Sequence, residues 1–288
     1  MSKIMIKQNK LLFIIELILL VLFLHTSANA LGNFGTGDGE FAVPYGCAVD
    51  LQGNIYVADS GNNRVQKFDS TGKFLSKFGS WGVADGQFAH PLGIALDRRG
   101  NIYVADTGNN RIQKFDSSFN FITSISTINP QMFYPRDVVV DKEGNIFVVD
   151  SGNHRVLKFN SNGQPIGNFG SRGSSTGQFI DPYGIALDNA GNIYVADTCN
   201  HRIQKFNPSF NFLSAIGNGE GVTPGKLLYP QDVAVDSDGN IYVSDTDNHR
   251  LQKFDPSGNH LEVIGSMGQG KGRFLTPQKL AIHQNKLY

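Results

Sequence analysis

The stretch PYGIALDNAGNIYVADTCNHRIQKF, residues Pro182 to Phe206, decides the fold because it recurs along the chain. Aligned on their first residue, the copies are separated by 47, 44, 47, 48 and 47 residues. A period in the forties, built from short strands, is typical of a β-propeller in which each repeat forms one four-stranded blade. The copies begin at Pro44, Pro91, Pro135, Pro182, Pro230 and Pro277.

Four strands can be placed inside one copy. Gly46 to Asp50 is an apolar run, as expected for the innermost strand, and Ile55 to Ala58 follows after a glycine-containing turn. Polar and apolar residues alternate from Arg64 to Phe68, and Lys73 to Phe78 forms the outermost strand. The sequence therefore predicts an all-β fold, a six-bladed β-propeller of four-stranded antiparallel blades that start near the six prolines.

A triplet of one kind recurs before the third strand of the later copies. It stands as Asn153-His154-Arg155, Asn200-His201-Arg202 and Asn248-His249-Arg250. With its surrounding stretch, this triplet resembles the NHL repeat, a family named for a similar Asn-His-Leu triplet. The resemblance covers the chain after residue 30, with five full copies and one partial copy. It implies a β-propeller domain over residues 31–288, commonly with six blades.

The sixth copy is incomplete at the C-terminus. After Pro277 the chain offers residues 280–282 as an inner strand and Leu287-Tyr288 as the start of a second strand. Asn33-Phe34-Gly35 matches Asn168-Phe169-Gly170, so an N-terminal strand is predicted to supply the outer strand of blade six and to close the ring. Because an open propeller leaves unpaired strand edges, we also expect the natural chain to continue beyond Tyr288.

The first thirty residues differ from the repeats. Three lysines precede an apolar run from Leu11 to Leu24, and the small residues Ala28 and Ala30 follow at the two positions that a signal peptidase reads. This pattern predicts a secretory signal over residues 1–30, cleaved after Ala30, and hence a secreted or extracytoplasmic protein. The alternative is an uncleaved membrane anchor, although the fourteen-residue run is shorter than the roughly twenty residues that a span needs.

Charge and cysteine content narrow the function classes. Without residues 1–30 the chain keeps 22 basic and 24 acidic side chains, because three Lys and one Glu lie in that segment, so its net charge is −2. Nucleic-acid binding usually leaves a basic patch, so the sequence disfavours nucleic acid as a partner. Cys47 and Cys199 lie three repeats apart, and we expect two free thiols.

Residues repeated in every blade are assigned to blade construction. An Asp and an Arg flank the loop between the second and third strands, where an ion pair would satisfy both. One loop position holds either His or Asn, and because Asn is a poor substitute for a His metal ligand, we predict a loop hydrogen bond there. The turn from Asp236 to Asn240 opens like a calcium loop, but a hairpin already explains its residues.

Positions that differ between copies are better candidates for a binding site. The residues after each proline vary, and because they begin the inner strands they should ring one mouth of the central channel. Polar side chains there would form a cup for a hydrogen-bonding ligand, or else decorate the rim of a water-filled channel. The candidate ligand-binding residues are Tyr45, Arg136, Asp137, Tyr183, Gln231, Asp232, Gln278 and Lys279.

The loops between blades also vary. The loop from Ser80 to His90 contains the single tryptophan, Trp81. Variable loops on a rigid scaffold are a usual place for recognition. Trp81 is therefore a candidate anchor for a protein partner, with packing over its own blade as the alternative.

The sequence favours a non-catalytic extracytoplasmic interaction scaffold over an enzyme. No nucleophile is accompanied by a base, and no His follows any of the six prolines. We therefore assign no catalytic residue, no metal site and no cofactor. The expected partner is a protein, a small polar ligand or a carbohydrate, and the expected state is a monomer.

The resemblance also leaves other classes open. The lyase half of the peptide-amidating monooxygenase is similar in architecture and carries zinc on histidines near its channel, whereas here His90 alone precedes a proline. Lactonase-like propellers hold a divalent metal on carboxylates, and Asp137 and Asp232 at the mouth keep a calcium or zinc enzyme as the alternative. RNA-binding and ubiquitin-ligase NHL proteins are disfavoured by the signal segment and the near-neutral charge.

Overall fold

The computed structural model describes residues 33–127, 131–217, 219–270, 272–283 and 286–288. The predicted signal segment and its cleavage after Ala30 lie outside these ranges. Within them we find no helix with the length and hydrophobicity of a membrane span.

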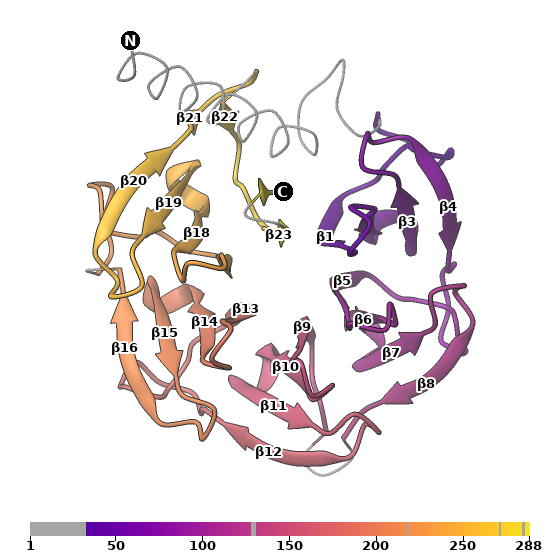
Figure 1. Ribbon diagram of the computed structural model, residues 1–288, viewed down its shortest axis with the longest axis horizontal. Coiled ribbons are helices and arrows are strands. Elements are labelled where there is room, and N and C mark those ends of the chain that lie inside the picture. The colour runs from indigo at the N-terminus through magenta and orange to yellow at the C-terminus, as the bar shows by residue number, and fades with distance from the viewer. Residues whose placement is uncertain (1–32, 128–130, 218, 271, 284–285) are drawn as a thin grey trace.

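Five four-stranded antiparallel sheets surround a central channel as the blades of a propeller (Figure 1). In each blade the first strand lies next to the channel and the fourth lies outermost. The strands are β1 (Pro44–Val49), β2 (Ile55–Asp59), β3 (Arg64–Phe68) and β4 (Phe74–Phe78); β5 (Pro91–Leu96), β6 (Ile102–Asp106), β7 (Arg111–Phe115) and β8 (Phe121–Ile125); β9 (Pro135–Val140), β10 (Ile146–Asp150), β11 (Arg155–Phe159) and β12 (Pro165–Phe169); β13 (Pro182–Leu187), β14 (Ile193–Asp197), β15 (Arg202–Phe206) and β16 (Phe212–Ile216); and β17 (Asp232–Val235), β18 (Ile241–Asp245), β19 (Arg250–Phe254) and β20 (His260–Ile264).

Burial falls from the second strand outward. All five residues of β2 are buried, because neighbouring blades cover both faces of the sheet at this radius. The outer strand β4 alternates between half-buried and exposed residues. This gradient explains why IYVAD reads as a nearly continuous apolar run while the outer strands carry polar residues at alternate positions.

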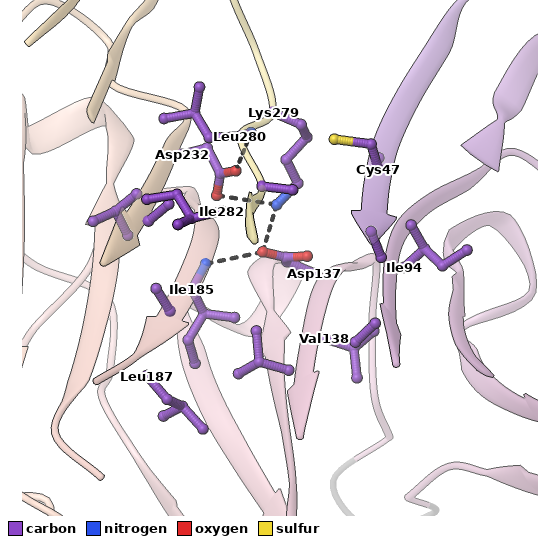
Figure 2. Close-up of a pocket in the computed structure, with 18 of the residues that line it drawn as sticks. Cys47, Ile94, Asp137, Val138, Ile185, Leu187, Asp232, Lys279, Leu280 and Ile282 are labelled. Atoms are coloured by element: carbon purple, nitrogen blue, oxygen red, sulfur yellow. Dashed lines mark hydrogen bonds and ion pairs between the residues drawn. The ribbon is translucent and has the colours of Figure 1, made fainter. Parts of the chain in front are cut away.

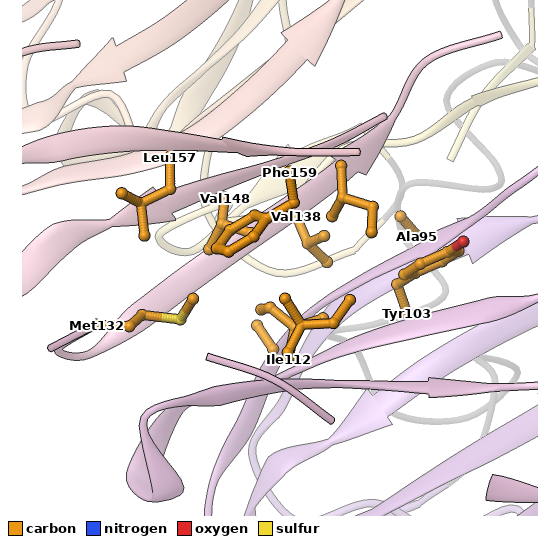
Figure 3. Close-up of a cluster of buried hydrophobic side chains, with 11 residues drawn as sticks. Ala95, Tyr103, Ile112, Met132, Val138, Val148, Leu157 and Phe159 are labelled. Atoms are coloured by element: carbon orange, nitrogen blue, oxygen red, sulfur yellow. The ribbon is translucent and has the colours of Figure 1, made fainter. Parts of the chain in front are cut away.

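The hydrophobic core lies between blades. Tyr103 and Ile112 of the second blade pack against Val148, Leu157 and Phe159 of the third in one buried cluster (Figure 3). A matching cluster joins the fourth blade to the fifth. A single blade would therefore leave its large apolar faces in water, and the ring is the unit that buries them.

Antiparallel pairing defines two faces of the ring. Asp59 at the end of β2 pairs with Pro44 at the start of β1 and with Arg64 at the start of β3. These strand ends, the short 3₁₀ helix η2 (Ser60–Asn62) and the loop to the next blade lie on one side, which we call the proline face. The tight turns, such as the one from Asp50 to Asn54, lie on the opposite side, which we call the turn face.

The predicted number of six blades is wrong, because the described residues form five. After β20 the chain pairs β21 (Ser266–Met267) with β22 (Arg273–Phe274) in parallel, and then forms the hairpin of β23 (Ile282–His283) and β24 (Lys286–Leu287). The parallel pair repeats the Trp81–Phe88 bridge of an interblade loop and is not part of a blade. The hairpin alone corresponds to the predicted sixth blade.

The predicted N-terminal closing strand is also wrong for Asn33-Phe34-Gly35. Phe34 forms a parallel bridge with Phe41, seven residues later, as Trp81 does with Phe88. The segment therefore aligns with the interblade loop and not with an outer strand, and the match to Asn168-Phe169-Gly170 was out of register by three residues. Residues 27–31, which align with β4, lie outside the described residues.

The C-terminal hairpin joins the two ends of the five-blade arc. Leu280 and Leu287 pack in a cluster with Tyr242 and Leu251 of the fifth blade. Tyr288 packs in another cluster with first-blade residues that include Ile55. The hairpin thus contacts both neighbours of the gap in Figure 1.

Candidate binding site at the channel mouth

The repeated Asp and Arg residues form an internal network, as predicted. Arg64 Nε donates to Asp59 Oδ2 at 2.7 Å, and the same carboxylate accepts from Gln66 Nε2 at 3.0 Å. Its other oxygen accepts from the main-chain N–H of Ala42 at 2.8 Å, while the Arg64 terminal nitrogens donate to carbonyls of the interblade loop. The pair therefore attaches each interblade loop to its blade, and the other blades repeat it at 2.6–2.7 Å.

The His or Asn position serves a loop hydrogen bond, as predicted. His201 Nδ1 accepts the main-chain N–H of Tyr229 at 3.1 Å, and Asn110 Oδ1 accepts that of Tyr134 at 2.8 Å. Both residues adopt a left-handed backbone conformation, with φ of +54°. Each supplies one acceptor at the same point, which explains why the two residue types alternate there.

The calcium-like turn uses its carboxylate within the hairpin. Asp236 Oδ1 accepts main-chain N–H groups from Asp238 at 3.0 Å and Asn240 at 2.8 Å. Its Oδ2 accepts from the Asn240 amide at 2.8 Å and from the Tyr242 hydroxyl at 3.3 Å. Both carboxylate oxygens are thus committed to the turn.

The inner strands enclose a channel with a cavity of about 270 Å³. Most of its lining side chains are apolar, and Ile94, Val138, Ile185 and Leu187 are among them (Figure 2). The charged lining residues lie together at the end of the channel that is nearest the proline face. The channel therefore has mostly apolar side chains along its length and a charged group at one end.

That charged group consists of Asp137, Asp232 and Lys279. The Lys279 ammonium contacts Asp137 Oδ2 and donates to Asp232 Oδ1 at 3.2 Å, and its side chain is only 8% exposed (Figure 2). Each carboxylate also accepts a main-chain N–H from the next inner strand, Asp137 from Ile185 at 2.9 Å and Asp232 from Leu280 at 2.8 Å. One ammonium and two amides therefore bind the two carboxylates and link the inner strands.

Glycines make room for the two carboxylates. A Cβ on Gly184 would lie 2.7 Å from the Gln231 carbonyl oxygen and 2.8 Å from Asp232 Cα. A Cβ on Gly93 would lie 2.7 Å from Asp137 Oδ1. Asp137 and Asp232 were predicted from the sequence, but the role of the glycines was not. The signal was an alternation of Gly and Asp at the second position after the proline of each full copy.

Burial changes the titration of this group. Burial raises the pKa of Asp232 above its ordinary range; Lys279 opposes the rise and Asp137 adds to it. Although burial alone would lower it, the two carboxylates raise the pKa of Lys279. Burial also raises the pKa of the nearby Cys47 thiol to about 12, so this thiol is not an activated nucleophile.

Four further predicted residues converge above the charged group. The Tyr45 hydroxyl donates to Gln231 Oε1 at 3.0 Å, a contact between the first and fifth blades. The Arg136 guanidinium stacks on the Tyr183 ring at 3.6 Å, a contact between the third and fourth blades. Burial and then Tyr183 raise the pKa of the Tyr45 phenol while Arg136 lowers it, so the two pairs interact electrostatically. We call these four residues the mouth cluster.

The remaining predicted residues lie differently. Gln278 contributes its main-chain carbonyl oxygen, which accepts from the Ser244 hydroxyl at 2.8 Å. Trp81 is 75% exposed on the proline face, so it does not pack over its blade. Cys47 and Cys199 are both free thiols, as predicted.

The donor set at the mouth does not favour a divalent metal. Asp137 and Asp232 do converge as the lactonase-like alternative requires, but the Lys279 ammonium lies between them. A cation at that point would have to displace Lys279 and would meet two carboxylate ligands where calcium takes six to eight oxygens. Among the described residues no three His, Cys, Asp or Glu side chains are grouped to hold a metal ion.

Sequence comparisons match the repeats one at a time. A family model described as the NHL repeat matches residues 41–68, 88–115, 134–159, 179–206 and 227–254. Protein lin-41 of Caenorhabditis elegans is 54% identical over 46 residues, which is 16% of this chain and 4% of that protein. NHL repeat-containing protein 3 of Homo sapiens is 40% identical over 57 residues, 19% of this chain and 15% of that protein. The matched part is therefore a small fraction of each relative.

Solved structures share the fold at low identity. A streptogramin B lyase superposes with a TM-score of 0.62 and 15% identity, covering 84% of this chain and 74% of that one. The gluconolactonase XC5397 from Xanthomonas campestris gives 0.61 and 17%, covering 85% and 81%. A nidogen–laminin complex gives 0.59 and 17%, covering 85% and 86%. The same architecture thus occurs in enzymes and in a protein complex.

Proposed function

The chain belongs to the NHL-repeat β-propeller family, and on this premise we propose that it is a non-catalytic extracytoplasmic scaffold whose proline face binds a protein or a polar ligand. The main support for the proposal is that the three side chains of the charged group at the channel mouth are already paired. Asp137, Asp232 and Lys279 are bonded to one another and to the main chain, which leaves no free base or nucleophile among them.

The proline face offers apolar contacts around this mouth. Trp81 and Val83 in one interblade loop are 75% and 77% exposed, and Val222 in another is 70% exposed. Val43, which directly precedes the first inner strand, is 68% exposed. Large apolar side chains presented on loops of a rigid scaffold are typical of a recognition surface. The nidogen–laminin structure, in which a similar fold takes part in a protein complex, supports the same assignment.

The second candidate is a metal-dependent propeller enzyme, favoured by the convergence of Asp137 and Asp232. The streptogramin B lyase and the gluconolactonase, which are enzymes of similar fold, also support this candidate. Lys279 argues against it, because its ammonium neutralises the carboxylates that would bind the metal. Metal analysis of the dialysed protein separates the two candidates: one tightly held equivalent of zinc or calcium would overturn the scaffold proposal.

Photo-crosslinking tests the proposed binding face. A photoreactive phenylalanine analogue is placed at Val83 or Val222 on the proline face, and at Leu51 on the turn face or Leu261 on β20 as exposed controls. We expect a discrete adduct in the exported protein from the first two positions and not from the controls. Equal adducts from all four positions, or none, would count against the proposal.

N-terminal sequencing tests the extracytoplasmic part. The mature protein should begin at Leu31. A protein that retains Met1 and remains in the soluble cytoplasmic fraction would contradict export.

A further inference from the structure

Arg136 in the mouth cluster lacks an acceptor. Its Nε is buried and has no hydrogen-bond partner in the part of the chain that the structure describes. Among the described residues its guanidinium has one recorded contact, the stacking on Tyr183 at 3.6 Å. A buried, unpaired N–H costs about 1–3 kcal/mol, so such a group is retained where another role requires it.

The other charged groups beside it, one cation and two anions, are already paired. Lys279 binds Asp137 and Asp232 directly below, and Asp137, the next residue after Arg136, also accepts from Ile185. Gln231 uses its side-chain oxygen for Tyr45 and is left with an amide donor. The mouth cluster therefore has more donors than acceptors, and a ligand that fits it must accept hydrogen bonds.

We propose that Arg136 binds the carboxylate of a ligand on the proline face, with the Gln231 amide as a second donor. The assignment rests on the proposed function and names the chemistry of its ligand. Stacking on Tyr183 fixes the plane of the guanidinium, which suits the two parallel hydrogen bonds of a planar carboxylate. A dianion such as phosphate fits less well, because Arg136 is the one unpaired cation of the cluster and two carboxylates lie just below it.

The surroundings also define the rest of the ligand. Val43 and Tyr134 directly precede β1 and β9, and Tyr229 lies three residues before β17; these side chains are 68%, 49% and 40% exposed. These three side chains and the Tyr45 and Tyr183 rings provide apolar surface on the proline face, close in the chain to the starts of the inner strands. The ligand is therefore a monocarboxylate with an apolar part, either a small organic acid or the C-terminus of a peptide.

Titration calorimetry of the purified propeller tests the proposal with hexanoate and its neutral amide, hexanamide. Hexanoate should bind and hexanamide should bind at least tenfold more weakly, because a charge-assisted hydrogen bond contributes about 1.5–3 kcal/mol. The Arg136→Gln variant should bind hexanoate more weakly than the parent protein by a similar factor. Arg136→Lys should retain part of it, because lysine keeps the charge without the planar fork.

Arg172→Gln is the matched control, since Arg172 lies exposed on the proline face away from the mouth cluster. It should bind hexanoate as the parent does, and melting curves verify that every variant is folded. N-acetyl-trialanine and its C-terminal amide separate the two sources of carboxylate. Tighter binding of the peptide acid than of hexanoate identifies a peptide C-terminus, and equal or weaker binding identifies a small acid.

Equal binding of hexanoate and hexanamide, or unchanged binding by Arg136→Gln, would overturn the carboxylate assignment. That result leaves the scaffold proposal standing if the Val83 and Val222 adducts still form. Loss of those adducts while Arg136-dependent hexanoate binding persists would instead overturn the broader protein-binding function.

Discussion

The conspicuous charged residues of each repeat have a structural task. Asp106 lies fully buried and accepts hydrogen bonds from Arg111, Gln113 and the main chain of Ala89. The same set recurs in other blades, so it cannot distinguish one blade as a binding site. Specific recognition must come from residues that break the repeat, such as Arg136 and Tyr183.

Arg111 contacts two carboxylates, the buried Asp106 and the exposed Asp85. Removal of the first should lower the stability of the fold strongly, and removal of the second only slightly. Asp106→Ala should reduce the free energy of unfolding by about 3–5 kcal/mol, because it removes the carboxylate that neutralises Arg111 and accepts from its Nε and from the main-chain N–H of Ala89. Asp85→Ala, which removes an exposed carboxylate 3.6 Å from the same arginine, should cost at most about 1 kcal/mol. Urea unfolding measures both, and similar losses for the two variants would contradict the structural assignment.

Because His and Asn occupy the same loop position in different blades, a His-to-Asn substitution there should be tolerated by the fold. His201→Asn should change the free energy of unfolding by less than about 0.5 kcal/mol, because Asn keeps the acceptor for Tyr229 and adopts a left-handed backbone readily. His201→Ala should cost about 1–2 kcal/mol, because it loses the acceptor and keeps the unfavourable backbone conformation. Thermal melts of both variants provide the comparison; an Asn variant as unstable as the Ala variant would refute the interpretation.

At the level of strands, contacts between neighbouring inner strands decide which residues can begin a blade. Gly184 at the start of β13 leaves the space that Asp232 of β17 occupies. The carboxylate then binds the main chain of Leu280, one inner strand further on. A position that looks variable in the sequence is thus constrained by the blade beside it.

Gly184→Ala tests this constraint. The added Cβ would meet main-chain atoms that cannot move aside, and overpacking of this kind should cost about 2–3 kcal/mol. Gly37→Ala is the control, because its Cβ would meet only side-chain atoms of the half-buried Glu40, the nearest at 2.9 Å, and no main-chain atom. Equal stability of the two variants in chemical unfolding would show that the inner strands adjust more freely than proposed.

The buried Asp232 predicts a pH dependence of stability. Because its pKa is raised in the folded protein, the folded state holds a proton that the unfolded state has lost between about pH 4 and neutrality. Its contribution to stability is therefore present below pH 4 and lost as pH rises through the folded pKa. Asp232→Asn should make the melting temperature less dependent on pH over this range, and an unchanged pH profile would contradict the assigned direction.

At the level of the whole molecule, the described residues join the fifth blade to the first through the two-stranded hairpin β23–β24. Tyr288 lies beside Phe41, Ile55 and Phe68 of the first blade, while Leu287 lies with the fifth-blade cluster. Closure therefore depends on side-chain packing on both sides of the hairpin. The mouth cluster depends on it too, because the Tyr45–Gln231 bond joins the first and fifth blades.

Tyr288→Ala should loosen this closure. Loss of a largely buried aromatic side chain should cost about 3 kcal/mol, and hydrogen exchange should increase in β2 and β18 more than in β10 on the far side of the ring. Leu261→Ala, an exposed change on β20, is the control. Uniform faster exchange in all five blades would mean that the hairpin is not a local closing element.

The sequence by itself determined the blade. A repeat in the forties, an apolar second strand and an Asp–Arg pair at constant spacing specify local structure, because strand pairing within a blade and hairpin bonding join residues close in the chain. The paired charges and the His or Asn hydrogen bond followed from comparing copies. Free cysteines followed from their separation by three repeats.

Only the tertiary structure decided the number of blades and the state of the mouth. Counting prolines could not show that the last copy forms a hairpin, nor that Phe34 bridges Phe41, because short motifs match in more than one register. The sequence placed eight polar residues near one another, but it could not show that Lys279 neutralises Asp137 and Asp232 while Arg136 lacks an acceptor. The Lys279 contacts join residues 142 and 47 positions apart in the chain, and closure of the ring brings them together.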